Sequence, residues 1–324
     1  MMRRGCLLGT ALLLLALVAA IVFASGWWGS ARIDEDTTFI VPAGASLTSV
    51  AHKLEDEGVI ASADAFLVRA KVFGSGDPVK AGEFLLPGGS SPARILDTLQ
   101  QGNVIRRFAA IPEGLPAIMV HERLMAEPLL TGTIPVPEEG SILPDSYDFE
   151  RGESRAALVA RMQAAMDRTL KQLWAGRRAG ACPVDTPREA VILAAIVEKE
   201  TGKPAERRTV AGVYCNRLRI GMKLDADPTV IYPITKGKPL GRRILRSELN
   251  AITGYNTYRE PGLPKGPITN PGKASIAAVL DPAPTQALYF VADGTGGHVF
   301  ARTLAEHEAN RRKWFAIRRA RGEM

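Results

Sequence analysis

The chain has 324 residues, of which 46% are hydrophobic and 23% charged, and a net charge of +7. This balance excludes wholesale disorder, and the length suffices for one large or two modest domains. The positive charge favours an anionic polymer or a membrane surface as partner. No recognisable nucleic-acid-binding motif is present, and no H-x-x-x-H or C-x-x-C spacing occurs, so we expect no nucleic acid, no metal and no cofactor.

Residues 7–24 form a run of 18 residues without a charge, preceded by Arg3 and Arg4 and followed by Trp27 and Trp28. The run is long enough to span a membrane, with a positive flank and an aromatic belt. A cleaved signal peptide is the alternative. Because the run exceeds the usual signal-peptide core, we favour an uncleaved anchor over 1–29 with a cytoplasmic tip. Both interpretations place everything after residue 30 outside the cytoplasm.

After a linker (30–37), a small module is predicted over 38–102. Apolar periodicity and turn residues predict its elements in the order β-α-α-β-α, at 39–44, 46–58, 63–73, 80–86 and 91–101. From the pattern alone, this module could bind a ligand or act as a spacer.

A larger mixed domain is predicted over 103–324, so the fold class is α+β. Its predicted strands are 104–111, 288–291 and 298–300, the last two forming a hairpin. Helices are expected at 116–126, 154–174, 187–201, 204–220 and 273–280, followed by a basic helix from about 304. A Pro/Gly-rich loop separates the first two helices, and polar loops are expected at 225–232 and 255–268.

The start of the helix 187–201 is clearly marked. Thr186 and Glu189 have the spacing of a capping box, and Pro187 suits the first helical position. The residues that follow are almost all apolar, which predicts a buried helix. Gly202 offers a stop at its C-terminus.

This apolar helix ends in two carboxylates, Glu198 and Glu200. Hydrocarbon surroundings disfavour the carboxylate anion and raise its pKa, so such a group can deliver a proton near neutral pH. Residues two apart on a helix point about 200° apart, so the two glutamates cannot share one site. Glu200 lies in line with the bulkier apolar row, a weak preference for it as the acid. Two solvated charges at a fraying helix end are the alternative.

Cys182 and Cys215 are the cysteines outside the anchor. In an oxidising compartment they could pair, whereas two free buried thiols are the alternative, and the sequence leaves the choice open.

Several motifs together resemble the MltG (YceG-like) family of endolytic murein transglycosylases, and their order along the chain matches as well. The resemblance covers about residues 38–314, and the 38–102 module resembles that family's LysM-like subdomain. The motifs are Ile196-Val197-Glu198-Lys199-Glu200-Thr201, Asn216-Arg217-Leu218, Met222-Lys223-Leu224, Asp227-Pro228-Thr229-Val230-Ile231-Tyr232, Tyr255-Asn256-Thr257-Tyr258, Gly262-Leu263-Pro264 with Gly266-Pro267-Ile268, and Tyr289-Phe290-Val291-Ala292-Asp293-Gly294 with Gly297-His298.

The resemblance implies cleavage of the β-1,4 bond between N-acetylmuramic acid and N-acetylglucosamine inside peptidoglycan strands. The C6 hydroxyl of the sugar attacks C1, so no water is consumed and 1,6-anhydro ends result. One carboxyl then suffices where ordinary glycosidases use two. By match to the family motif the catalytic residue is Glu200, general acid and then base. The resemblance also implies a single-pass anchor in the inner membrane, a periplasmic catalytic part, termination of nascent strands, and peptidoglycan synthases (penicillin-binding proteins) as partners.

Substrate-binding roles follow from the same motifs, since amide and aromatic side chains suit sugar hydroxyls and C–H faces. The candidates are Glu206, Asn216, Asp225, Asp227, Thr229, Tyr255, Asn256 and Tyr258. A structural turn is the alternative for Asp227, Thr229 and Tyr232, and His298 is expected to pack in a hairpin rather than to catalyse. Asp225 departs from the family's usual Gln; it could raise the pKa of Glu200 or face solvent.

Two other functions fit parts of the pattern. A non-catalytic, membrane-anchored glycan-binding scaffold needs the small module and the basic surface but not Glu200. A hydrolytic muramidase needs a second carboxylate to position water, for which Asp225 or Asp227 could serve.

Overall fold

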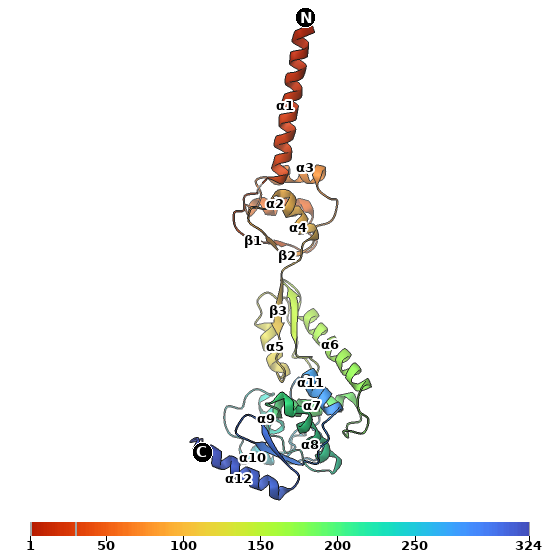
Figure 1. Ribbon diagram of the computed structural model, residues 1–324, viewed down its shortest axis with the longest axis vertical. Coiled ribbons are helices and arrows are strands. Elements are labelled where there is room, and N and C mark those ends of the chain that lie inside the picture. The colour runs from red at the N-terminus through yellow and green to blue at the C-terminus, as the bar shows by residue number, and fades with distance from the viewer. Residues whose placement is uncertain (1, 30, 324) are drawn as a thin grey trace. The chain divides into compact units, whose positions relative to one another are not determined.

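The computed structural model describes residues 2–29 and 31–323. Residues 1, 30 and 324, which fall in the predicted anchor, linker and catalytic domain, lie outside the described residues. The chain divides into two compact units, Met1–Arg107 and Phe108–Met324. Both contain helices and strands (Figure 1), which confirms the predicted mixture of α and β structure.

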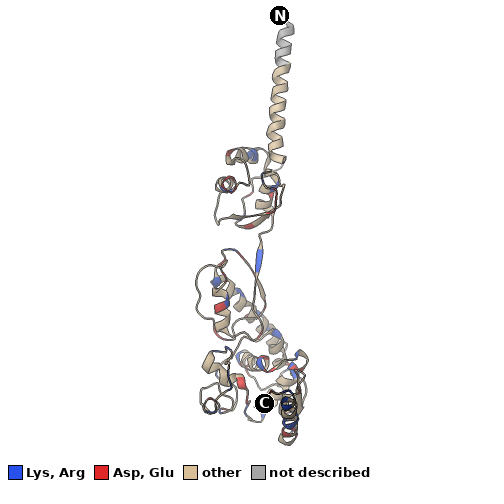
Figure 2. Cartoon of the chain, turned by 90° about the vertical axis from the view of Figure 1, so that its left-hand side faces the viewer, with Lys and Arg blue, Asp and Glu red and all other residues tan. Residues whose placement is uncertain are grey.

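The first unit begins with one long apolar helix, α1 (Met2–Trp28). Within it, the 19 residues Thr10–Trp28 have a mean hydropathy of 2.3 and are long and apolar enough to cross a membrane. Figure 2 shows no charged residue along this stretch. The predicted run 7–24 therefore belongs to a single helix.

The remainder of the first unit packs three helices on a two-stranded sheet. Ser46, Ser62 and Ser91 each cap a helix by accepting a hydrogen bond from the backbone N–H three residues on. The order β-α-α-β-α is the predicted one, whereas the LysM likeness stays a prediction. The elements are β1 (Thr37–Val41), α2 (Leu47–Asp56), α3 (Ala63–Phe73), β2 (Gly82–Leu86) and α4 (Pro92–Gln101), with β1 and β2 antiparallel.

The second unit has two hydrophobic clusters. One joins α5 (Ala117–Met125) and α6 (Arg155–Ala175) to the sheet of β3 (Arg106–Ala110), which starts at the unit boundary, and β4 (Ser146–Glu150). The larger one is built from α7 (Pro187–Glu200), α8 (Arg207–Arg219) and α11 (Lys273–Leu280). The other elements are a 3₁₀ turn (Pro204–Glu206), α9 (Asp227–Thr235), α10 (Arg246–Asn250), the antiparallel pair β5 (Tyr289–Ala292) and β6 (His298–Ala301), and α12 (Leu304–Ala320).

The prediction of a loop over 225–232 is wrong, because α9 occupies most of it. Asp227 stands in its first turn and Pro228 at its start, where a missing N–H costs nothing and negative charge suits the helix dipole. The prediction took this Asp-Pro pair as a turn. Strand β4, inside the expected Pro/Gly-rich loop, and the short α10 were also missed.

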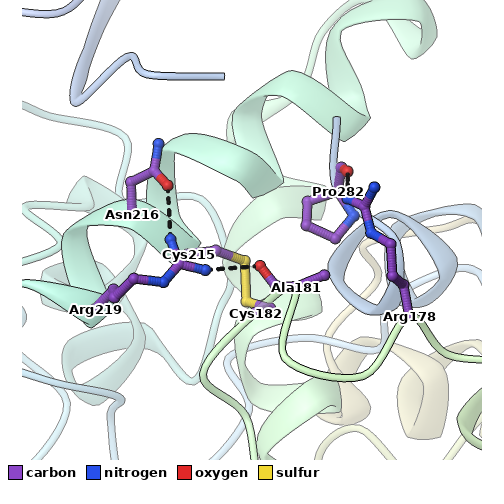
Figure 3. The surroundings of a disulfide bond; sticks show 7 residues. All are labelled: Arg178, Ala181, Cys182, Cys215, Asn216, Arg219 and Pro282. Atoms are coloured by element: carbon purple, nitrogen blue, oxygen red, sulfur yellow. Dashed lines mark hydrogen bonds between the residues drawn. A yellow bond between two sulfur atoms is a disulfide. The ribbon is translucent and has the colours of Figure 1, made fainter. Parts of the chain in front are cut away.

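A disulfide joins Cys182, in the segment leading into α7, to Cys215 of α8. Figure 3 shows Arg219 beside it, donating 2.9 Å hydrogen bonds to Asn216 Oδ1 and to the carbonyl of Ala181. The structure thus decides the question that the sequence left open. The bond ties together two segments of the larger cluster that are 33 residues apart.

Candidate active site

Helix α7 presents its last residue, Glu200, to a cavity. The helix starts with the predicted capping box of Thr186 and Glu189, and residues 190–197 are all buried. It ends at Glu200, and the backbone of the next residue, Thr201, is extended. Gly202 does not supply the left-handed stop expected of it. A Cβ there would instead lie 3.0 Å from the carbonyl oxygen of Gly296, so close packing accounts for this glycine.

The two glutamates of this helix point to different places, as predicted. Glu198 accepts a 2.9 Å hydrogen bond from the backbone N–H of Gly272 and lies 3.5 Å from Arg207 Nη2, with a side chain only 7% exposed. Glu198 is thus held inside the fold, whereas Glu200 lines the cavity.

The cavity has a volume of about 660 Å³ and is formed by α7, α8, the start of α9, β5 and α12. A second, smaller cavity of about 270 Å³ also has Glu200 in its wall, with Trp314 again beside it. The larger one is lined by Glu200, Tyr214, Arg217, Leu224, Asp225, Asp227, Tyr258, Tyr289, Phe290, Val291, Leu304, His307, Glu308, Arg311, Trp314 and Phe315. One carboxyl therefore faces two adjoining spaces with acidic, basic and aromatic walls.

The Glu200 carboxyl has a pKa raised to about 7. Burial is the main cause, the charge of Asp227 adds to it, and Arg217 opposes it. A carboxyl with this pKa is partly protonated at neutral pH, so it can both give and accept a proton there.

Asp227 and Tyr258 form a pair in the cavity wall. Tyr258 Oη donates a 2.7 Å hydrogen bond to Asp227 Oδ1. Burial and this contact raise the pKa of the Tyr258 hydroxyl, so it stays a donor. The two residues are 31 positions apart in sequence and were both predicted as site residues.

Asp225 lies in the same wall with its backbone in the left-handed region, at φ +50°. Aspartate tolerates this conformation better than most residues. Burial raises the pKa of its carboxyl, although Arg217 Nη1 lies 3.6 Å away. Asp225 is not among the groups that shift the pKa of Glu200.

Arg217 is a cavity residue that our sequence reasoning did not select. It is 7% exposed and donates hydrogen bonds to the carbonyls of Leu288 (2.6 Å) and Leu224 (2.7 Å). The sequence could have predicted that Arg217 is buried. It follows the apolar residues Val213 and Tyr214 by four and three positions, so it lies on the same face of α8 as they do. It supplies a fixed positive charge inside the site.

Helix α12 contributes to both cavities and was predicted only as a basic helix. His307, Arg311, Trp314 and Phe315 come from it, and it packs on β5 and β6. Lys and Arg recur along its sequence. The sequence feature that could have indicated a role in the site was the aromatic pair Trp314 and Phe315 between those charges.

Glu206 and Asn216 lie outside the larger cavity. Glu206 accepts a hydrogen bond from the backbone N–H of His298 (3.1 Å), and its Oε2 lies 2.8 Å from Nδ1 of the same residue. His298 lines the smaller cavity. The Asn216 amide donates to the carbonyls of Thr285 and Ala287, which fixes the chain entering β5.

Thr229, Tyr255 and Asn256 serve the packing around the cavity. Thr229 is fully buried and bonded to Thr257 Oγ1 at 2.9 Å. The buried Asn256 amide donates to three backbone carbonyls, and its Oδ1 accepts from the N–H of Tyr258. The Tyr255 ring lies 4.8 Å from that of Tyr232. Their contacts are within the protein, and their assignment as substrate-binding residues stays a prediction.

Among the residues whose side chains are described, 10–29 and 31–323, no group of three or more His, Cys, Asp or Glu side chains could hold a metal ion.

Residues 39–313 match the YceG-like family. A Bacillus subtilis protein named endolytic murein transglycosylase is 27% identical over 308 residues, covering 85% of this chain and 84% of its own length. A Streptococcus pneumoniae protein of the same name is also 27% identical; the match covers 90% of this chain and 62% of that protein. The crystal structure of a YceG-like protein from Listeria monocytogenes superposes with a TM-score of 0.52 at 27% identity, over 85% of this chain and 99% of that one.

Proposed function

This chain belongs to the YceG-like family, and from that premise we propose that it is an endolytic lytic transglycosylase of peptidoglycan. Its substrate is the β-1,4 bond between N-acetylmuramic acid and N-acetylglucosamine inside a glycan strand, and its product carries a 1,6-anhydro end. The names of the relatives support the activity. The observation that carries the mechanism is a carboxyl with a pKa of about 7 in the wall of a cavity large enough for sugar rings.

In the first step, the protonated Glu200 gives its proton to the glycosidic oxygen, and the bond from that oxygen to C1 of N-acetylmuramic acid breaks. The leaving sugar departs with a free 4-hydroxyl. In the second step the C6 hydroxyl of the same muramic acid forms a bond to C1, and the Glu200 carboxylate takes its proton. Atoms and charges balance without water, and Glu200 returns to its starting state.

Four neighbouring side chains in the cavity wall assist this chemistry or bind the sugars. The Asp227 anion favours the protonated form of Glu200 and can stabilise the positive charge that develops at C1. Tyr258 holds that carboxylate in place through its 2.7 Å hydrogen bond. Trp314 and Tyr289 offer ring faces for the C–H faces of the sugars.

We further propose that α1 anchors the protein in the inner membrane, with Arg3 and Arg4 on the cytoplasmic side. The rest of the chain then lies in the periplasm, where its substrate is and where disulfides such as Cys182–Cys215 persist. In the periplasm, the 38–102 module, which resembles the family's LysM-like subdomain, binds glycan strands. The resemblance further suggests that cleavage ends nascent strands beside a peptidoglycan synthase.

The test is digestion of purified sacculi by the full-length protein in detergent, with the products identified by mass spectrometry. The wild type should release 1,6-anhydro muropeptides, and Glu200→Gln should release none above background. Glu198→Gln is the matched control, since it removes a charge from the same helix end but outside the cavity; it should retain activity. Products with reducing ends indicate a hydrolase instead. Glycan binding without any cleavage by the wild type indicates a scaffold.

A further inference from the structure

Helix α3 carries an exposed apolar stripe. Val68 and Val72 lie four residues apart on one row of the helix and are 54% and 60% exposed, and Phe73 beside them is 37% exposed. Arg69 and Lys71 flank the stripe. Adjacent large apolar side chains of this kind mark an interaction surface rather than a solvated face.

The same helix is fixed to the end of α1. Phe73 packs against Trp28, with ring centroids 4.8 Å apart, and against Phe23 at 5.7 Å. Trp27 is only 2% exposed and lies 5.6 Å from Phe66. In Figure 1, α3 lies beside the lower end of α1.

A polar contact and a close approach complete this attachment. Arg69 Nε donates a 3.1 Å hydrogen bond to the carbonyl of Phe23, and its guanidinium lies 5.3 Å from the ring of the same residue. A Cβ at Gly26 would come within 2.4 Å of Arg69 Nη2, so the absence of a side chain there makes room for the guanidinium. The contacts therefore hold α3 at the level of residues 23–28 of the apolar helix.

That level can be placed relative to a bilayer. At 1.5 Å per residue, the 19 residues Thr10–Trp28 extend about 28 Å, close to the roughly 30 Å of a hydrocarbon core. Trp27 and Trp28 follow the apolar run, and tryptophans in that position lie at the membrane–water interface, so this end of the span falls near the boundary of the hydrocarbon. Phe23 lies five residues, about 7.5 Å, before that end.

We propose that α3 is a membrane-interface helix: it lies in the outer surface of the bilayer, with Val68, Val72 and Phe73 among the acyl chains. Lys71 then reaches the headgroups, as a long basic side chain beside apolar ones does, while Arg69 keeps its hydrogen bond to the carbonyl of Phe23. The occupant of the stripe is the lipid bilayer itself. The inference rests on the proposed anchoring of α1 in a membrane, and it makes the small module part of the membrane surface rather than a body tethered above it.

Site-directed spin labelling of the full-length protein tests this. In a Cys6→Ser background the oxidised pair Cys182–Cys215 does not react, so a single introduced cysteine takes the nitroxide. Labels are placed at Val72→Cys and, as a matched control, at Leu85→Cys. Leu85 is a similarly exposed apolar residue (46%) on β2, which Figure 1 shows on the side of this unit away from α1. The protein is reconstituted into vesicles of three parts phosphatidylethanolamine to one part phosphatidylglycerol.

Accessibility to oxygen, which concentrates in lipid, is compared with accessibility to a water-soluble nickel chelate. The ratio at Val72 should exceed that at Leu85 by roughly threefold or more, as expected for burial some 5–10 Å into the interface. Equal ratios at the two positions overturn the proposal, and so does protection of Val72 from both reagents, which indicates a protein contact. A third label at Leu15→Cys reports on the anchor itself: if it too is water-accessible, the anchoring has failed rather than the docking of α3.

Discussion

Tyr258 donates a 2.7 Å hydrogen bond to Asp227 across 31 residues of sequence, and both side chains line the cavity that receives Glu200. The pair fixes a negative charge beside the proposed acid. The relationship connects the Asp-Pro-Thr and Tyr-Asn-Thr-Tyr motifs to Glu200 through the charge of Asp227.

Removing the charge of Asp227 should shift the pH dependence of cleavage. Without that anion the pKa of Glu200 falls, so less of the carboxyl is protonated at alkaline pH. Asp227→Asn is expected to lower the rate at pH 8 roughly tenfold and the rate at pH 5 by less. The measurement is the pH profile of anhydro-product release. Asp225→Asn is the control, because Asp225 faces Arg217 and does not raise the pKa of Glu200. If both variants give the same profile, the assigned role of Asp227 is wrong.

Replacing Glu200 should stabilise the fold at alkaline pH. The unfolded chain releases the Glu200 proton above about pH 4.5, whereas the folded chain holds it until about pH 7. Between these values the folded state binds more protons, so stability falls as pH rises and stays lower above pH 7. The difference corresponds to at most about 3 kcal/mol. Glu200→Gln should therefore unfold at a higher temperature than the wild type at pH 8, with little difference at pH 4.5. A lower unfolding temperature at pH 8 would contradict the raised pKa.

Helix α12 should matter for substrate affinity. Trp314 lines both cavities beside Glu200, so Trp314→Ala removes a ring face for sugar stacking. We expect kcat/KM to fall roughly tenfold, mostly through KM, as measured on purified glycan strands. Lys313→Ala, one residue earlier on the exposed side of the same helix, is the control and should behave as wild type.

Breaking the disulfide should destabilise the larger unit. A bond that closes a loop of 33 residues contributes about 3–4 kcal/mol by the chain-entropy relation. The variant with both Cys182→Ser and Cys215→Ser should therefore unfold at a lower denaturant concentration, and added reductant should lower the midpoint of the wild type but not of the variant. An unchanged midpoint in the variant would show that the covalent bond adds nothing to the packing around it.

The sequence was most informative where local rules suffice. The capping box at Thr186, the apolar run behind it and the divergence of Glu198 from Glu200 all depend on neighbours within one helix, and the structure confirms them. Asp227 and Pro228 show the limit of such rules. The pair fits a turn and a helix start equally well, and only the packing of α9 decides between them.

The composition of the site could be predicted only in part, because the cavity joins residues from distant segments. Asp225, Asp227 and Tyr258 were expected near Glu200 and line the same space. Arg217 and the aromatic residues of α12 were not expected: helical spacing indicates that Arg217 is buried, but only tertiary packing brings these side chains into the cavity beside Glu200. Asn256 illustrates the converse: its amide is consumed by three backbone carbonyls, a fact that no sequence pattern reveals.

The two ends of α7 are built on opposite principles. At its start, the side chains of Thr186 and Glu189 accept hydrogen bonds from free backbone amides, Pro187 has no N–H to satisfy, and Glu189 places a negative charge against the positive pole of the helix. At its finish, Glu200 stands against the negative pole, where backbone carbonyls repel an anion. The helix backbone thus acts on the carboxyl in the same direction as burial does. Both favour the protonated form of a side chain that would be ionised in bulk water at neutral pH.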